Sequence, residues 1–165
     1  GPLSLGLGYE QLNDGEQPDS TGLPVYEAEK RTSWSLGGSY DFGVAKLAAV
    51  YTQDKYKAVN QQSAKENGYL IAISAPVGAA GLVKASYNHY EEKEAGSFEK
   101  LKANKFSLGY VHSLSKRTAV YTTYSYIKNK NNAAGDNMGK VLVTGTTLKD
   151  SGKQQAIQVG VRHSF

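Results

Sequence analysis

The side chains best suited to a chemical role are cations and an amide that stand at alternate positions of extended segments. They are Arg31, Lys46, Lys84, Arg162 and Gln158, most of them set among serine, glycine and alanine. Alternate residues of a β-strand project from the same face, so each cation is expected on a polar wall of small side chains. Glu10 is the one acidic residue predicted on that wall. A wall of this kind attracts anions, which is an electrostatic rather than a bond-making role.

Few residues are candidates for bond-making chemistry. The histidines are His89, His112 and His163, and the chain has no cysteine, so a thiolate nucleophile or thiolate metal site is excluded. His112 and His163 share the parity of apolar neighbours near segment ends, where an imidazole acts as an interface anchor. His89 stands beside Tyr90, with no nucleophile tied to it. We therefore expect no enzyme, no cofactor and no metal.

Composition narrows the class of protein. The 165 residues include 18 Gly and 12 Tyr, and mean hydropathy is -0.49. No apolar run approaches the ~18 residues of a membrane helix, but a membrane β-barrel averages to a polar composition because apolar and polar residues alternate. The net charge of +4 is spread along the chain without a basic run of five, so we expect no nucleic-acid partner.

Eight segments alternate with the period of a strand. They cover residues 3–10, 31–40, 45–53, 68–75, 82–90, 105–113, 118–127 and 155–165. Long polar connections at 11–30, 54–67, 91–104 and 128–153 alternate with short ones at 41–43, 76–81 and 114–116. This alternation is typical of an antiparallel up-and-down transmembrane β-barrel, whose short turns face the periplasm and whose long loops face outside. Both chain ends are then expected at the periplasmic rim.

Aromatic residues gather near the ends of the predicted strands. Those near the external ends are Tyr9, Trp34, Tyr51, Tyr87, Tyr124 and Tyr126, and those near the periplasmic ends are Tyr40, Tyr110, Tyr121 and Phe165. Two aromatic bands separated by aliphatic residues are the girdles that membrane barrels place at the two interfaces.

The chain end carries a family resemblance. The terminal strand Gln158-Val159-Gly160-Val161-Arg162-His163-Ser164-Phe165, the turn Leu114-Ser115-Lys116-Arg117-Thr118 followed by Tyr121, and the opening Gly-Pro-Leu-Ser resemble the general porins of β-proteobacteria. The resemblance extends over essentially the whole chain. It implies a homotrimer of sixteen-stranded barrels in the bacterial outer membrane, with contacts to lipid and lipopolysaccharide. It also implies that Phe165 is the signal read by the barrel-assembly machinery.

Two architectures fit eight predicted strands. A closed eight-stranded barrel must fill its interior with side chains, whereas the predicted inward residues are small or charged with few counter-ions. This favours one all-β domain over residues 1–165 that forms the C-terminal half of a sixteen-stranded porin, its N-terminal half being the missing partner. That half would line a water-filled channel for passive diffusion of small hydrophilic solutes, mildly selective for anions. The alternative is a complete eight-stranded barrel with a structural or surface-binding role.

Overall fold

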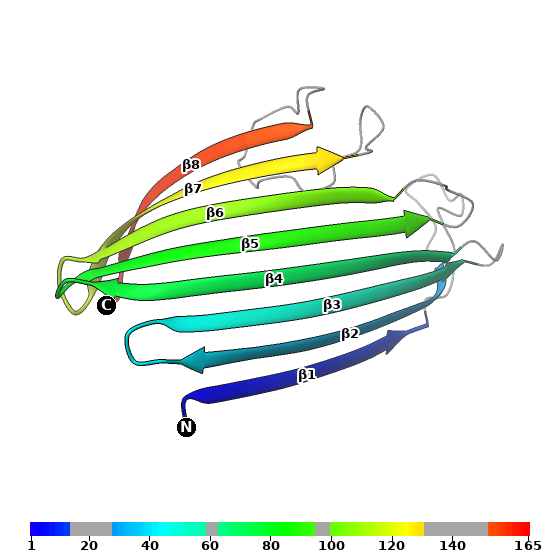
Figure 1. The fold of residues 1–165 in the computed structure, drawn as a ribbon, viewed down its shortest axis with the longest axis horizontal. Coiled ribbons are helices and arrows are strands. Elements are labelled where there is room, and N and C mark those ends of the chain that lie inside the picture. The colour runs from blue at the N-terminus through cyan, green and yellow to red at the C-terminus, as the bar shows by residue number, and fades with distance from the viewer. Residues whose placement is uncertain (14–27, 59–62, 95–99, 131–151) are drawn as a thin grey trace.

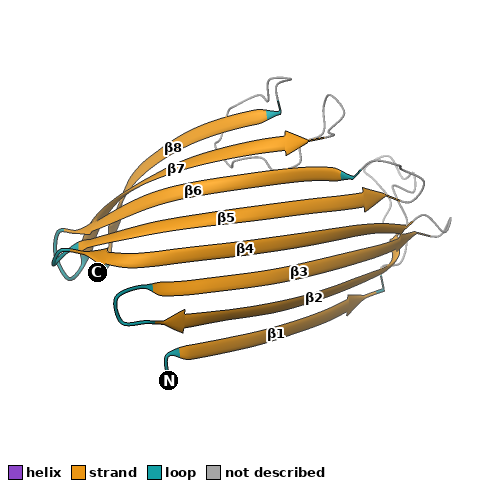
Figure 2. Ribbon diagram, viewed as in Figure 1, coloured by secondary structure: helices purple, strands orange, loops and turns teal. Residues whose placement is uncertain are grey.

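The computed structural model describes residues 1–13, 28–58, 63–94, 100–130 and 152–165, which form eight β-strands (Figures 1 and 2). Their bounds are β1 Leu3–Leu12, β2 Ala28–Asp41, β3 Lys46–Ala58, β4 Ser63–Val77, β5 Gly81–Glu94, β6 Leu101–Ser113, β7 Thr118–Lys130 and β8 Lys153–His163. Within these ranges no helix long and apolar enough to cross a membrane is found.

The strands form one curved antiparallel sheet in which every strand pairs with its neighbours in the chain, in the order β1 to β8 (Figure 1). Among the described residues, β1 pairs only with β2 and β8 only with β7. The closed eight-stranded barrel requires β1 to pair with β8, so this alternative is not the observed fold. Both chain ends lie at the end of the sheet that carries the three short turns, as predicted (Figure 1).

The strands extend further than predicted at the end opposite the short turns, here called the external end. The predicted loops 54–67 and 91–104 were too long, because β3 continues to Ala58, β4 begins at Ser63 and β5 continues to Glu94. These extensions carry polar residues on both faces, so the alternation of apolar and polar side chains disappears. Backbone pairing nevertheless continues, because ladder hydrogen bonds do not depend on side-chain polarity.

The register of the sheet sets the two faces. Tyr9 lies opposite Trp34, Leu36 opposite Tyr51, and Tyr51 opposite Tyr69, so the predicted apolar parity is shared across neighbouring strands. The same holds through β8, where Ile157 lies opposite Tyr124. We call this side the convex face and the opposite side the concave face.

Apolar side chains cover the convex face rather than a central core. Fully buried residues in the described chain are few, whereas large apolar side chains such as Leu7 (77% exposed), Ile71 (55%) and Val159 (75%) are open on the convex face. A continuous exposed apolar face on every strand is the surface that a membrane barrel presents to lipid.

Local sequence closes the short turns. Gly43 and Gly78 adopt positive φ angles of 82° and 62°, which residues with a Cβ rarely adopt. The Asp41 carboxylate accepts a hydrogen bond of 2.8 Å from the Gly43 N–H. In the third turn the Ser115 hydroxyl accepts from the N–H groups of Arg117 and Thr118 at 3.2 and 3.1 Å. These turns hold the short end of the sheet together.

Candidate functional site

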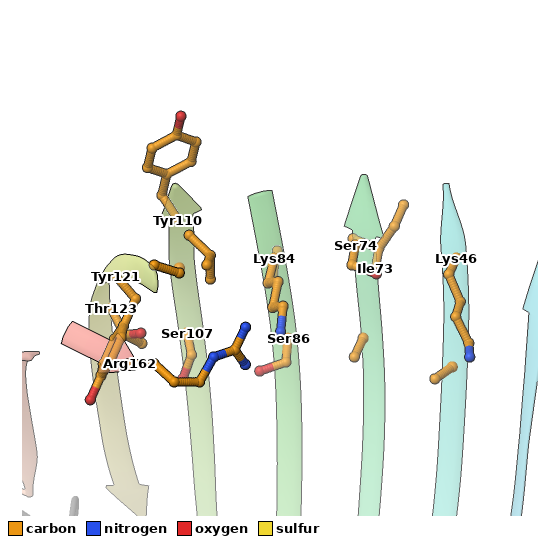
Figure 3. A pocket seen from close by; sticks show the side chains of 16 residues that line it. Lys46, Ile73, Ser74, Lys84, Ser86, Ser107, Tyr110, Tyr121, Thr123 and Arg162 are labelled. Atoms are coloured by element: carbon orange, nitrogen blue, oxygen red, sulfur yellow. The ribbon is translucent and has the colours of Figure 1, made fainter. Parts of the chain in front are cut away.

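A hollow of about 540 Å³ lies on the concave face and gathers three of the predicted cations. Lys46 comes from β3, Lys84 from β5 and Arg162 from β8, and Figure 3 shows all three directed to one side of the sheet. Tyr110 and Ile73 point to the other side (Figure 3). The three cations are exposed and form no ion pair among the described residues.

The register places two of these cations and the predicted Gln158 in one row across the sheet. Lys46 lies opposite Ser74, which lies opposite Lys84, so the two lysines are two strands apart, about 10 Å at the usual strand spacing. The row continues through Gly109 and Thr123 to Gln158. Two lysine ammonium groups on strands at this separation repel each other, and water or a bound anion between them weakens the repulsion.

Small side chains keep the hollow open. Ala48, Ala72, Ser86, Ser107 and Gly109 line the hollow together with the cations.

Tyr121 also lines the hollow. It lies opposite Gly160, where an added Cβ would collide with the Tyr121 ring. Its prediction as part of the periplasmic girdle was therefore wrong. Tyr121 was assigned to the girdle from its place near the strand end, although Val120, Thr122, Tyr124 and Tyr126 were assigned to the outward parity and Tyr121 falls between them.

Arg31 does not join the other cations. Its Nη2 lies 3.1 Å from Oδ1 of Asp54, its guanidinium lies 5.3 Å from the centre of the Tyr56 ring, and it is absent from the lining of the hollow. Ser33 donates a second hydrogen bond to the same carboxylate. The prediction of Arg31 as an uncompensated wall cation was wrong, because its counter-ion lies in a stretch that was assigned to a loop.

Acidic residues form a row at the external end of the concave face. Glu10 lies opposite Ser33, and the row continues through Asp54, Glu66 and Glu92. The prediction that Glu10 was the only inward acid was therefore wrong.

Lys105 is a further inward cation that the sequence reasoning missed, on the row of Asn88 and Ile127. Its parity within the strand predicted for 105–113 could have identified it. The concave face is thus acidic near its external end and basic nearer the short turns.

Apart from Tyr121, the predicted aromatic residues share the convex face. Rings of Trp34 and Tyr51 have centroids 4.9 Å apart, those of Tyr51 and Tyr69 4.8 Å, and those of Tyr69 and His89 6.1 Å, a continuous series across β2 to β5. Gln53 Nε2 donates to the Tyr51 hydroxyl oxygen at 2.9 Å. Tyr69 was predicted on this face but not as part of the girdle, although it completes the series.

The remaining predicted girdle residues lie on the same face. Tyr87 and Tyr126 are both opposite Phe106, and Tyr124 is opposite Leu108. Because the strands extend further than predicted, Tyr51, Tyr87 and Tyr124 lie near the middle of their strands rather than at the external ends.

The convex face near the short turns carries a second aromatic group. Tyr40 and Phe42 have ring centroids 4.6 Å apart, and His163 and Phe165 meet edge to face at 4.9 Å. Tyr110 lies there as well, opposite Val83. Phe42 was not predicted as part of this group, because it lies in a turn outside the alternating segments.

All three histidines lie on the convex parity, away from the hollow. His89 Nδ1 is 2.7 Å from the Asn104 amide oxygen, His112 Nδ1 is 3.1 Å from the Tyr110 hydroxyl, and His163 Nδ1 is 2.9 Å from the Thr118 hydroxyl. Each imidazole has one polar neighbour on the apolar face, and for His112 and His163 the interface-anchor role stays a prediction.

Comparisons with known proteins agree with this geometry. Outer membrane porin protein 32 of Delftia acidovorans is 39% identical over the whole chain, and an outer membrane porin of Bordetella pertussis is 33% identical. The chain spans 43% of the length of each relative.

Solved structures lead to the same fold. The anion-selective porin from Comamonas acidovorans superposes with a TM-score of 0.78 at 39% identity, covering all of this chain and 46% of that one. OmpT of Vibrio cholerae, in its loop L8 deletion mutant, is similar in fold alone, with a TM-score of 0.71 at 15% identity and 49% of its chain covered. The eight strands therefore correspond to about half of an outer-membrane porin barrel.

A family model for Gram-negative porins matches residues 1–132. Together with the named relatives, this match places the chain in the outer membrane of a Gram-negative bacterium. The open eight-stranded sheet, its apolar convex face and its polar concave wall are thus explained together: the chain belongs to the Gram-negative porin family.

Proposed function

We propose that this chain forms half of the wall of a water-filled channel through which small hydrophilic solutes diffuse passively, with a mild preference for anions. The observation that carries the proposal is the convergence of Lys46, Lys84 and Arg162 on one open hollow of the concave face. Exposed cations without counter-ions raise the local concentration of anions and lower that of cations. The related porin from Comamonas acidovorans is described as anion-selective, which supports the same direction.

The external row of acids explains why the preference is mild. Glu10, Asp54, Glu66 and Glu92 lie on the same wall as the cations, and Arg31 is already bound to Asp54. An anion entering from outside passes this row before it reaches Lys84 and Arg162. The entrance therefore offsets part of the attraction that the deeper cations exert.

Completion of the barrel requires further strands. In hydrocarbon, each unpaired backbone group at the edges of β1 and β8 costs several kcal/mol, so both edges need partners. We propose that the N-terminal half of a sixteen-stranded barrel supplies them and that three such barrels form a homotrimer. A trimer form of OmpT, an outer membrane protein of Vibrio cholerae with the same fold, supports the assembly.

The convex face is proposed to contact membrane lipid between two aromatic girdles. Tyr9, Trp34, Tyr51, Tyr87, Tyr124 and Tyr126 belong to the external girdle, and Tyr40 and Tyr110 to the periplasmic one. Outward apolar residues of β4 run from Tyr69 to Val77, which spans about 27 Å along the strand and about 21 Å of height at a tilt of ~40°. That height approaches the ~25 Å apolar band of membrane barrels. Lipopolysaccharide in the outer leaflet is then a neighbour of the external end.

Phe165 is proposed to be the signal that the barrel-assembly machinery reads. Its side chain is completely exposed beyond the end of β8 and contacts only the His163 ring among the described aromatic pairs. Deletion of Phe165 should lower the amount of folded porin in the outer membrane several-fold while leaving the conductance of each inserted channel unchanged. Membrane fractionation with single-channel recording measures both, and normal insertion would contradict the assignment.

No catalytic step belongs to this proposal. The charged wall lowers the electrostatic energy of an anion in the channel, and each solute moves down its own concentration gradient. The test is the reversal potential of the complete porin in a planar bilayer under a KCl gradient. We expect the sign that reports chloride preference, and potassium preference would overturn the proposal.

A further inference from the structure

Charges of opposite sign are separated along individual strands of the concave face. On β5, Lys84 lies near the short turns, and Glu92 lies eight residues further toward the external end on the same parity. On β3, Lys46 and Asp54 are separated in the same direction by the same eight residues. Eight residues extend about 26 Å along a strand, or about 20 Å along the channel at a tilt of ~40°.

Further cations belong to the inner part of this wall. Arg162 is the penultimate residue of β8, at the end that carries the short turns, and its side chain lines the hollow with those of Lys46 and Lys84. Lys105 of β6 lies opposite Asn88, which follows Lys84 by four residues. None of the four cations forms an ion pair among the described residues. We call Lys46, Lys84, Lys105 and Arg162 the basic zone.

Acidic residues belong to the outer part of the wall. Glu66 lies directly opposite both Asp54 and Glu92, and Glu10 lies on the same row. The charge of Asp54 is balanced by Arg31, whereas Glu10 and Glu66 form no ion pair in the described chain. We call Glu10, Asp54, Glu66 and Glu92 the acidic zone. Its net charge is negative, opposite in sign to that of the basic zone.

Each zone acts mainly on ions in its own part of a water-filled channel. The Debye length is about 10 Å at ~0.1 M salt, which is half the distance of about 20 Å between Lys84 and Glu92 along the channel. It also matches the distance of about 10 Å from a wall charge to an ion on the axis, so the field of a zone reaches the ion path. Two to three charges then enrich the opposite ion about twofold beside each zone.

This order of charges makes the resistance of the channel depend on the sign of the voltage. When the external side is positive, cations enter through the acidic zone and anions enter through the basic zone. Each ion then passes the zone that enriches it, and both ions accumulate between the zones. When the external side is negative, each ion must first pass the zone that repels it, and the space between the zones is depleted of both. The current is therefore larger when the external side is positive.

We propose that the order of charges on the concave wall makes this channel an ion rectifier, which carries more current when the external side is positive. The inference rests on the proposed function, in which this wall lines a water-filled channel. It does not follow from anion preference, because preference depends on the sum of the wall charges and rectification depends on their order along the channel. The two properties are therefore measured separately.

The test compares double variants of the complete porin that remove charge from one zone each. E10Q/E66Q removes two charges of the acidic zone, and K84Q/R162Q removes two charges of the basic zone. K55Q/K65Q is the matched control, because it removes two positive charges from the convex face, where Lys55 lies opposite Lys65. The partner half of the barrel is the same in every form, so differences between the forms report the charges of this half.

Currents of single channels are recorded at voltages of both signs, with equal KCl concentrations on the two sides of a planar bilayer. Every form carries K116C with an attached biotin in the third short turn, where the side chain is exposed. Streptavidin added to one chamber binds only when the short turns face that chamber, which gives the orientation of the channel. A heat-modifiable shift on gels shows that each variant is folded.

At ~0.1 M salt we expect the parent to carry about 1.5- to 2-fold more current when the external side is positive, since each zone changes local ion concentrations about twofold. At ~1 M, where the Debye length is about 3 Å, the two currents should become equal. E10Q/E66Q and K84Q/R162Q should each reduce the excess current by about half. In reversal potentials, however, E10Q/E66Q should raise anion preference and K84Q/R162Q should lower it. The control should match the parent in both measurements.

Several results would overturn the inference. One is a parent that conducts equally at both signs at ~0.1 M salt, or more strongly when the external side is negative. Another is an asymmetry that persists at ~1 M, because it would then come from the shape of the pore or from voltage-dependent closure. An unchanged asymmetry in either double variant, or a reduced one in the control, would also contradict the assignment to the two zones.

These outcomes distinguish the inference from the proposed function. A parent that prefers chloride but conducts equally at both signs retains the proposed function and is no rectifier. A parent that rectifies but prefers potassium retains the ordered wall charges and contradicts the proposed ion preference.

Discussion

Neutralising the three cations of the concave hollow should reduce anion preference by an amount that depends steeply on salt. The perturbation is the triple variant K46Q/K84Q/R162Q, which replaces exposed cations by shorter neutral polar side chains. Because none of the three forms an ion pair in the described chain, the substitution leaves no unpaired partner behind. The change in selectivity therefore reports the direct effect of charge on a passing ion.

The expected size follows from the geometry of the wall. A sixteen-stranded barrel has a backbone radius of about 16 Å, and a lysine side chain reaches about 6 Å inward, so each charge lies about 10 Å from an ion on the axis. In water that charge contributes about 0.4 kcal/mol, reduced by screening to about 0.1 kcal/mol at ~0.15 M salt and about 0.3 kcal/mol at ~0.01 M. Three cations attract an anion and repel a cation by these amounts. The triple variant should thus lower the anion-to-cation permeability ratio about threefold at ~0.15 M and about 20-fold at ~0.01 M.

Reversal potentials of single channels under gradients at the two mean salt concentrations measure this ratio. K55Q/K65Q is the matched control, because its charges lie on the lipid side of the wall, and it should leave the ratio unchanged. A loss that is the same at both salt concentrations would refute the electrostatic reasoning. So would a loss in the control as large as that in the triple variant.

Two further predictions concern residues of the concave wall. G160A should lower the free energy of unfolding by about 1–3 kcal/mol, because its Cβ would collide with the Tyr121 ring. The control G6A has no atom within 4 Å of its added Cβ and should cost no more than about 0.5 kcal/mol, so equal unfolding midpoints of the two variants in urea would contradict the packing argument. D54N removes the charged partner of the Arg31 guanidinium, so anion preference should rise. The free energy of unfolding should fall by less than about 1 kcal/mol, because the side chains of Arg31 and Asp54 are 39% and 21% exposed. An unchanged reversal potential would show that this guanidinium does not act on the passing ion.

Much of the fold could be predicted because apolar and polar residues alternate in the sequence of a strand that has one apolar and one polar face. Leu3, Leu5 and Leu7 alternate with Ser4 and Gly6, and the same parity reappears in the register of every strand. Lipid on one side and water on the other impose this contrast residue by residue. Loop lengths then indicated the direction of the chain, and the short turns lie together as expected (Figure 1).

The candidate site could be predicted only where each side chain acts by itself. Lys46, Lys84 and Arg162 were assigned to the inward wall from parity, and the structure brings them to one hollow. Arg31 was assigned by the same rule, but its role depends on Asp54, 23 positions away in the chain. Parity within one strand carries no information about which residue of the next strand lies opposite.

The sequence by itself determined the class of the protein, the two faces of the alternating segments and the inward side of Lys46, Lys84 and Arg162, because these follow from the period-two geometry of one strand. The tertiary structure alone decided where strands end in polar surroundings and which charges become neighbours. It paired Arg31 with Asp54, aligned an acidic row across the external wall and set Lys55, Lys65 and Lys93 opposite one another. Register between strands is a property of several segments at once, and the energies of those contacts exist only when the sheet is formed.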